Sequence, residues 1–227
     1  MKEGSSGGVV NQRENAAKWY KKFHVSDYAV LLHLPFSTVV LDFAVIGGMM
    51  APYVHVERLV PALIGVFLAH QGSHYLDEVK GRHWNTSIPN KVLFSLSILF
   101  LVTAAAIGIY LASTVSMMIA VFILPMVFFP ITYSLELWNE RFHESIWFGV
   151  SCALVCLGSF FLQTLTVSIF SVLMSIAVGI QGTYIIILYE ATKNSTTKDL
   201  AWNVLKGIVL LWNFIALSFV IAKFVGL

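Results

Sequence analysis

Seven long apolar runs constrain this sequence more than any other feature. They lie at residues 28–52, 57–79, 92–112, 116–134, 146–165, 167–189 and 204–226. Each has the roughly 20 residues that an α-helix needs to cross the hydrocarbon core of a bilayer. Only helices and closed barrels satisfy their backbone hydrogen bonds inside lipid. We therefore predict an all-α, polytopic membrane bundle of about seven transmembrane helices.

The composition indicates a single membrane domain. Hydrophobic residues make up 58% of the 227 residues and charged residues 11%, whereas a soluble domain has about 25% charged residues. The runs occupy most of residues 25–227, which we interpret as one transmembrane domain. Residues 1–24 contain basic and aromatic side chains and are expected to form a cytoplasmic tail at the membrane interface. We expect membrane lipid, and no nucleic acid, as the partner.

Lysines and arginines lie mostly on one side of the predicted bundle. With seven crossings, the N-terminus and the loops after the second, fourth and sixth runs share that side. The basic residues on or near it are Lys2, Arg13, Lys18, Lys21, Lys22, Lys80, Arg82, Lys91, Arg141, Lys193, Lys198 and Lys206. Only Arg58 and Lys223 fall opposite. Because positively charged loops stay in the cytoplasm, we expect a cytoplasmic N-terminus and an external C-terminus, in the plasma membrane of a prokaryote.

The second apolar run ends in an unusually polar stretch, residues 70–82. Residues three and four apart lie on the same face of a helix. His70, His74 and either Asp77 or Glu78 should therefore point into one cavity. Ionisable groups inside a bilayer are costly unless they face a cavity or a partner, so they often mark a functional site.

A second polar cluster, residues 133–144, follows the fourth run. Glu136, Glu140 and either His143 or Glu144 repeat the spacing of the first cluster, which predicts another helical face at the same end of the bundle. Glu140 and His143 also have the Glu-x-x-His spacing of carboxylate-bridged di-iron helical proteins. Because imidazole prefers zinc, iron, copper or nickel to magnesium, we predict a divalent metal site. Its candidate ligands are His70, His74, Asp77, Glu78, Glu136, Glu140 and His143.

A structural interpretation of the same residues remains open. The glutamates of the second cluster would then pair with Lys80, Arg82 and Arg141 in an interfacial belt. Asp42, deep in the first run, is expected either to line a cavity or to pair with a polar group of another span. The two cysteines, Cys152 and Cys156, lie in one apolar run and are interpreted as small buried hydrophobic residues.

Three stretches together carry a family resemblance. The second run ends in His70-Gln71-x-x-His74-x-x-x-Glu78-x-x-x-Arg82. An Ile-Pro pair with a leucine four residues after the proline follows within residues 86–93, and residues 160–164 precede the sixth run. Over residues 28–205 this pattern resembles the UbiA superfamily of intramembrane prenyltransferases. Members of that family have Asp-rich motifs at the ends of their second and sixth spans.

The resemblance implies a metal-dependent membrane transferase acting on a lipidic or isoprenoid substrate in a cytoplasm-facing cavity. The aspartates of the family hold Mg²⁺ on a prenyl diphosphate. This chain instead has Gln71, His74 and Glu78 in the first motif, and Glu190 and Asp199 in place of the second. We therefore expect a divalent metal that is Mg²⁺, or Fe or Zn in view of the histidines.

The resemblance also suggests roles for individual residues. The candidate catalytic residues are His74, Glu78 and Glu140. The candidate contacts to an anionic substrate are Lys80, Arg82, Tyr133 and Glu190, since Lys and Arg both suit phosphate. Two alternatives remain: a di-metal membrane oxidoreductase with carboxylate and histidine bridges, and a non-catalytic subunit with membrane protein partners that has lost the Asp-rich motifs.

Overall fold

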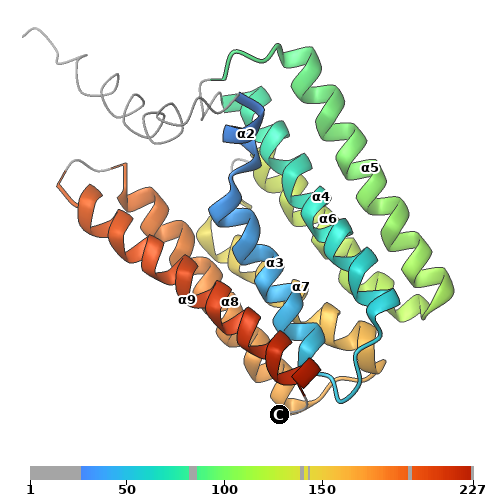
Figure 1. Ribbon diagram of the computed structural model, residues 1–227. Coiled ribbons are helices and arrows are strands. Elements are labelled where there is room, and N and C mark those ends of the chain that lie inside the picture. Colours follow the sequence, from blue (N-terminus) through green and yellow to red (C-terminus); the bar gives the residue numbers. More distant parts are fainter. Residues whose placement is uncertain (1–26, 82–85, 139–140, 143, 194–195, 226–227) are drawn as a thin grey trace, which may run out of the picture.

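The computed structural model describes residues 27–81, 86–138, 141–142, 144–193 and 196–225 (Figure 1). Its described part consists of helices and connecting turns. The elements are α2 (Asp27–Leu32), α3 (Leu34–Met49), α4 (Val56–Gly81), α5 (Asn90–Thr114), the 3₁₀ helix η1 (Met117–Ile119), α6 (Ala120–Ser134), α7 (Ser145–Thr164), α8 (Ile169–Ala191) and α9 (Lys198–Val225). The predicted tail, residues 1–24, lies outside the described residues.

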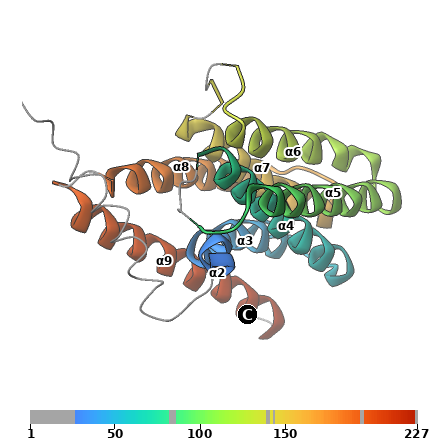
Figure 2. The ribbon, with the colours of Figure 1, turned by 90° about the horizontal axis from the view of Figure 1, so that it is seen from above.

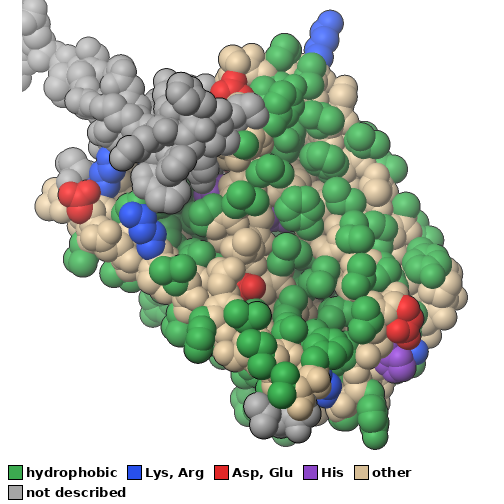
Figure 3. All heavy atoms as spheres, in the orientation of Figure 1, with side chains coloured by type: hydrophobic (Ala, Val, Ile, Leu, Met, Phe, Trp, Pro, Cys, Tyr) green, Lys and Arg blue, Asp and Glu red, His purple; other side chains and the backbone are tan. Residues whose placement is uncertain are grey.

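Six helical segments are long and apolar enough to cross a membrane: α2 with α3, then α5, η1 with α6, α7, α8 and α9. The chain is therefore an integral membrane protein. On the face drawn in Figure 3, hydrophobic side chains cover the middle of the molecule and most charged side chains lie towards its ends. Helix α4 has 26 residues, about 39 Å at 1.5 Å per residue, but it is too polar to be counted with the six. The predicted crossing by α4 stays a prediction.

Successive long helices run in alternating directions, so α4, α6 and α8 end at the upper end of the molecule as drawn in Figure 1. Helix α3 lies centrally and packs against α4, α7 and α9, while α5 packs on α4 and α8 on α7 (Figure 2). The polar ends of α4 and α6 therefore lie at the same end of the bundle, as the loop count predicts.

Small residues bring three of these helices into backbone contact. A Cβ added at Gly47 of α3 would lie 2.1 Å from the carbonyl oxygen of Cys156 in α7, and one at Gly149 of α7 would lie 2.4 Å from that of Gly179 in α8. Such close approach drives helix association where lipid competes for apolar contacts. Cys152 and Cys156 are buried free thiols, as predicted. Helix α7 is therefore in close contact with α3 on one side and with α8 on another.

Candidate functional site

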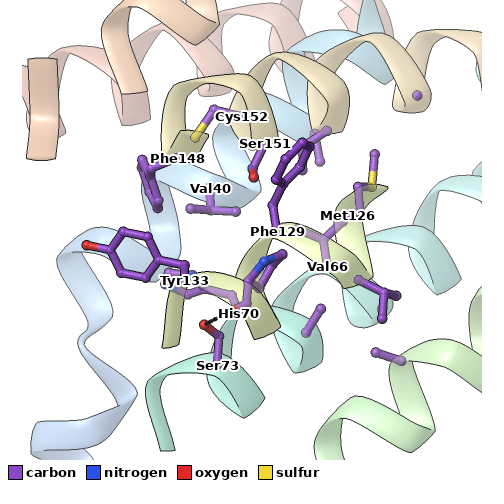
Figure 4. Close-up of a pocket in the computed structure, with 18 of the residues that line it drawn as sticks. Val40, Val66, His70, Ser73, Met126, Phe129, Tyr133, Phe148, Ser151 and Cys152 are labelled. Atoms are coloured by element: carbon purple, nitrogen blue, oxygen red, sulfur yellow. Dashed lines mark hydrogen bonds between the residues drawn. The ribbon is translucent and has the colours of Figure 1, made fainter. Parts of the chain in front are cut away.

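A cavity of about 240 Å³ lies among α3, α4, α6 and α7. Helix α5 and η1 contribute to one end of it and α8 to the other. Along α4 its wall extends from Ala62 to Asp77, about 22 Å at 1.5 Å rise per residue. Figure 4 shows Val40 of α3, His70 of α4, Tyr133 of α6 and Phe148 of α7 around the common space.

The two halves of the cavity differ in chemistry. The apolar half includes Ala62, Val66, Ile107, Leu111, Phe122 and Met126. The polar half, at the ends of α4, α6 and α8, includes His33, His70, Ser73, His74, Asp77, Tyr133, Glu190 and Lys193. Ligand pockets commonly combine apolar walls with a few convergent polar groups. This cavity therefore suits a molecule with a long apolar part and one polar end.

The polar half contains a pair of histidines in direct contact. The Nε2 atoms of His70 and His74 are 3.1 Å apart, and their rings are nearly perpendicular, with centroids 4.4 Å apart. In this hydrogen bond one ring donates through its Nε2–H and the Nε2 of the other ring accepts. The accepting ring is therefore neutral. The ring of His33 lies 5.3 Å from that of His74. Three imidazoles, two from α4 and one from the residue that precedes α3, thus meet in the cavity wall.

His33 reaches the cavity through a break between α2 and α3. It has φ 44° and ψ 48°, in the left-handed region, and Pro35 just after it cannot donate a backbone hydrogen bond. The backbone N–H of Phe36 bonds to the carbonyl of His33 at 3.0 Å. The carbonyl of Leu32 accepts from Ser37 Oγ at 2.6 Å and from Gln71 Nε2 at 3.0 Å. These side-chain donors satisfy backbone that the break exposes, as lipid requires.

Hydrogen bonds between α4 and α6 position Tyr133 in the wall. Ser73 Oγ donates to the carbonyl of Pro130 at 3.2 Å and lies 2.7 Å from Ser134 Oγ. Ser134 Oγ also lies 3.0 Å from the carbonyl oxygen of Ser73. Tyr133, next to Ser134, faces the cavity. The helix pair is therefore tied together at the polar end, where a ligand head group would lie.

The end of α8 contributes a charged pair to the same region. Lys193 Nζ donates to Glu190 Oε1 at 2.6 Å and lies 5.1 Å from the centre of the Tyr189 ring. Both charged side chains are about half exposed. Glu190, a predicted substrate contact, is thus in the cavity wall together with Tyr133. Lys193 was not among the predicted site residues.

Glu78 follows Asp77 on α4 but does not line the cavity. Its side chain is fully buried, and its Oε1 accepts from both the backbone N–H and the hydroxyl of Thr86, each at 2.9 Å. Glu78 therefore fixes the position of Thr86, in the segment between α4 and α5. The structure therefore selects Asp77, and not Glu78, as the carboxylate that shares a cavity with His70 and His74.

The prediction of a second helical face is wrong for the described residues. Helix α6 ends at Ser134, and Glu136 has φ 49°, so the helical spacing argument does not apply to it. Glu136 Oε2 lies 2.5 Å from Lys80 Nζ, which also donates to the carbonyl of Leu135 at 2.8 Å. The interfacial-belt interpretation is correct for this pair, and neither Lys80 nor Glu136 lines the cavity. Arg82, Glu140 and His143 lie outside the described residues.

The predicted seven-ligand metal set is not assembled in the described part of the chain. No group of three or more His, Cys, Asp or Glu side chains there is arranged to hold a metal ion. His70, His74 and Asp77 face the cavity, whereas Glu78 and Glu136 have the other partners described above. A divalent metal therefore stays a prediction.

Two further residues differ from expectation. Asp42 is buried but does not line the cavity, and its Oδ2 has no hydrogen-bond partner among the described residues. Neither of its two predicted environments is therefore observed. His33, which does line the cavity, was not a predicted site residue. The available signal was a polar residue two positions before Pro35 in an apolar run, because the α conformation is disfavoured just before a proline.

Comparisons with models of protein families, with characterised proteins and with solved structures found no match to this chain. The cavity is therefore the basis for inferring a function. Its distinguishing property is the position of the histidine pair, between a polar mouth at Glu190 and an apolar end at Leu111.

Proposed function

We propose that the protein is an integral membrane enzyme acting on the polar end of a lipidic, isoprenoid-like substrate. The observation that carries this proposal is a cavity that combines an apolar half among membrane-spanning helices with a polar half that contains acid–base groups. The substrate chain would lie against side chains such as Val66 and Met126. Its head group would lie beside His70, His74 and Tyr133.

The groups at the polar end suit proton transfer. Histidine is the side chain used most often as a general acid or base, and here one Nε2 of the pair donates while the other accepts. Asp77 and Tyr133 line the same half of the cavity. Proton transfer to or from a head group at this position therefore needs no movement of a helix.

Prenyl-transfer-like chemistry is supported by one further observation. The ends of α4 and α8 correspond to the two motif positions of the resembled family, and His74 and Glu190 from these ends line one cavity. Of the predicted metal ligands, His70, His74 and Asp77 are the described residues that line the cavity, although as a group they are not arranged to hold a metal ion. The distribution of Lys and Arg supports a polar half that faces the cytoplasm.

The experiment compares a cavity-filling variant with a matched surface variant. Ala69→Trp adds bulk to the cavity wall, whereas Ile64→Trp adds it to an exposed position on the same helix. Native mass spectrometry of the purified protein should detect bound lipid in the wild type and in Ile64→Trp, and little in Ala69→Trp. Equal occupancy in all three proteins would overturn the cavity as the binding site.

Turnover is tested with His74→Ala. Lipids extracted from the wild-type and variant proteins are compared by mass. An enzyme converts its substrate, so the variant should retain a lipid whose mass differs from that of the wild-type product. Identical lipids in both proteins would contradict an enzyme and favour the non-catalytic membrane subunit.

A further inference from the structure

We propose that the apolar half of the cavity has a lateral exit between α5 and α6, through which the far end of a long lipid chain extends into the bilayer. This inference rests on the proposed lipid-binding function and specifies the substrate class as lipids whose chain is longer than the cavity. It follows from a second apolar space that lies directly beside the cavity.

The second space is a groove between α5 and α6 on the surface of the bundle. Its walls include Ala105 and Ile109 of α5, and Leu124 and Phe128 of α6. Ile109 is 69% exposed and Leu124 is 70% exposed. Because both helices are long and apolar enough to cross a membrane, the groove is open to the lipid around the bundle.

The cavity and the groove share part of their walls. Ile123 and Val127, one turn apart on α6, line both spaces. Opposite them α5 contributes small residues, since Ala104 and Gly108 line the cavity and Ala105 lines the groove. A Cβ added at Gly108 would lie 3.0 Å from Cγ2 of Ile123. These five residues form a seam, one layer of side chains thick, between the cavity and the lipid-facing groove.

The seam is a weaker barrier than the apolar end of the cavity. At that end lie Leu111, Ile119 and Leu162, which are buried and pack in one hydrophobic cluster. Ile123 and Val127 are only partly buried. Displacing tightly packed core side chains is costly, so a chain that reaches the end of the cavity is directed sideways to the seam.

Helix α6 can move away from α5 at low cost. Helix α5 packs mainly on α4, and α6 packs mainly on α7 and α4, so neither helix depends on the seam for its main packing. The five side chains of the seam carry no polar atoms, so opening it breaks no side-chain hydrogen bond. Pro125 and Pro130 lie within α6, on either side of Val127. Because proline has no backbone N–H, α6 lacks two of its internal hydrogen bonds around this point.

The test compares two prenyl alcohols, farnesol with a chain shorter than the cavity wall and solanesol with a longer one. Their binding to the full-length variant Gly108→Cys/Ile123→Cys is measured in nanodiscs. The two positions are close enough for a disulfide, which would tie α5 to α6. The wild type and the reduced variant should bind both alcohols with similar affinity, since the end of the longer chain stays in lipid. After oxidation with diamide, the variant should bind solanesol at least about tenfold more weakly than farnesol, because the longer chain overpacks a closed cavity.

Two controls accompany this variant. Wild-type protein treated with diamide controls for oxidation of Cys152 and Cys156, and reductant should restore solanesol binding to the oxidised variant. Ile123→Ala, which thins the seam without a disulfide, should strengthen solanesol binding relative to farnesol. Val121→Ala should leave the ratio of the two affinities unchanged, because Val121 is exposed on α6 and lines neither space.

The outcomes separate this inference from the proposed function. Binding of farnesol with exclusion of solanesol in the wild type would overturn the lateral exit and leave a lipid-binding cavity. An affinity ratio that neither the disulfide nor Ile123→Ala changes would also overturn the exit. Failure of both alcohols to bind the wild type, or binding that Ala69→Trp leaves unchanged, would overturn the proposed cavity function itself.

Discussion

The last turns of α4 present two polar faces with different tasks. Asp77 and Glu78 are neighbours in sequence, yet Asp77 lines the cavity while Glu78 is fully buried and bonded to Thr86. His70 and Gln71 divide in the same way, because His70 faces the cavity and Gln71 bonds to the break between α2 and α3. One face of the helix is available to a ligand, and the other forms hydrogen bonds to the segments of chain before α3 and after α4.

The difference shows that polarity inside a membrane helix does not by itself mark a binding site. A buried polar group whose partner is removed costs its full desolvation. Substitutions on the chain-holding face should therefore reduce the stability of the fold. Substitutions on the cavity face should mainly change ligand binding. The following variants are ordered by their expected effect on stability.

Glu78→Ala should have the largest effect. It leaves the buried N–H and hydroxyl of Thr86 without the carboxylate oxygen that accepts from both. Loss of hydrogen bonds to a buried charged group should reduce the free energy of unfolding by about 2–4 kcal/mol. Denaturant unfolding in micelles measures this change, with the exposed Glu57→Ala as the control. A loss no larger than that of Glu57→Ala would contradict a chain-holding role.

Gln71→Ala should have the next largest effect. Gln71 Nε2 donates to the carbonyl of Leu32 at 3.0 Å and to Ser37 Oγ at 2.8 Å. Removing both bonds from the break should cost about 1–3 kcal/mol. Lipid occupancy should also fall, because this break brings His33 to the cavity. Ser97→Ala is the matched control, since it removes one hydrogen bond from α5 to the carbonyl of Gly72, the residue next to Gln71 on α4. Unchanged lipid occupancy in Gln71→Ala would show that the break between α2 and α3 does not contribute to lipid binding in the cavity.

The histidine pair should show a non-additive effect on stability. His70→Leu alone leaves His74 Nε2 without its partner in the pair, which should cost about 1–2 kcal/mol. His70→Leu/His74→Leu replaces both partners with apolar groups and should be nearly neutral for folding. A double-mutant cycle of unfolding free energies measures the coupling. Additive losses would argue that the two rings act independently in holding the fold.

Lys80→Ala should have the smallest effect. Its ion pair with Glu136 lies at a partly exposed position, where such pairs contribute about 0–1 kcal/mol. The loss should shrink further at high salt, since screening weakens exposed pairs. Unfolding at low and high ionic strength checks this, with Lys193→Ala, from the other partly exposed pair, as the comparison. A loss above that of Gln71→Ala would place Lys80 among the structural residues.

The spans and one face of the site were predictable from the sequence. Six of the seven apolar runs correspond to helices long and apolar enough to span a membrane. Helical spacing placed His70 and His74 together, and the structure brings their rings into contact. Both predictions rest on local geometry, which a short stretch of sequence specifies.

The second polar cluster was mispredicted because the helix ends early. The spacing of Glu136, Glu140 and His143 implies one face only if α6 continues through them. Helix α6 stops at Ser134, and the left-handed conformations of Glu136 and Trp138 redirect the chain. The spacing of polar residues does not show where a helix ends. A left-handed residue can therefore interrupt a sequence pattern that fits a continuous helix.

The sequence by itself determined that this is a membrane bundle with a polar end to α4, because apolar length and helical periodicity are local properties. It left open whether Asp77 or Glu78 faces the cavity, since both positions satisfy the spacing from the histidines. The tertiary structure decided this by placing Thr86 beside Glu78 and α6 beside Ser73. Which face of a helix binds a ligand depends on its neighbours, and these include elements distant in sequence, such as α6.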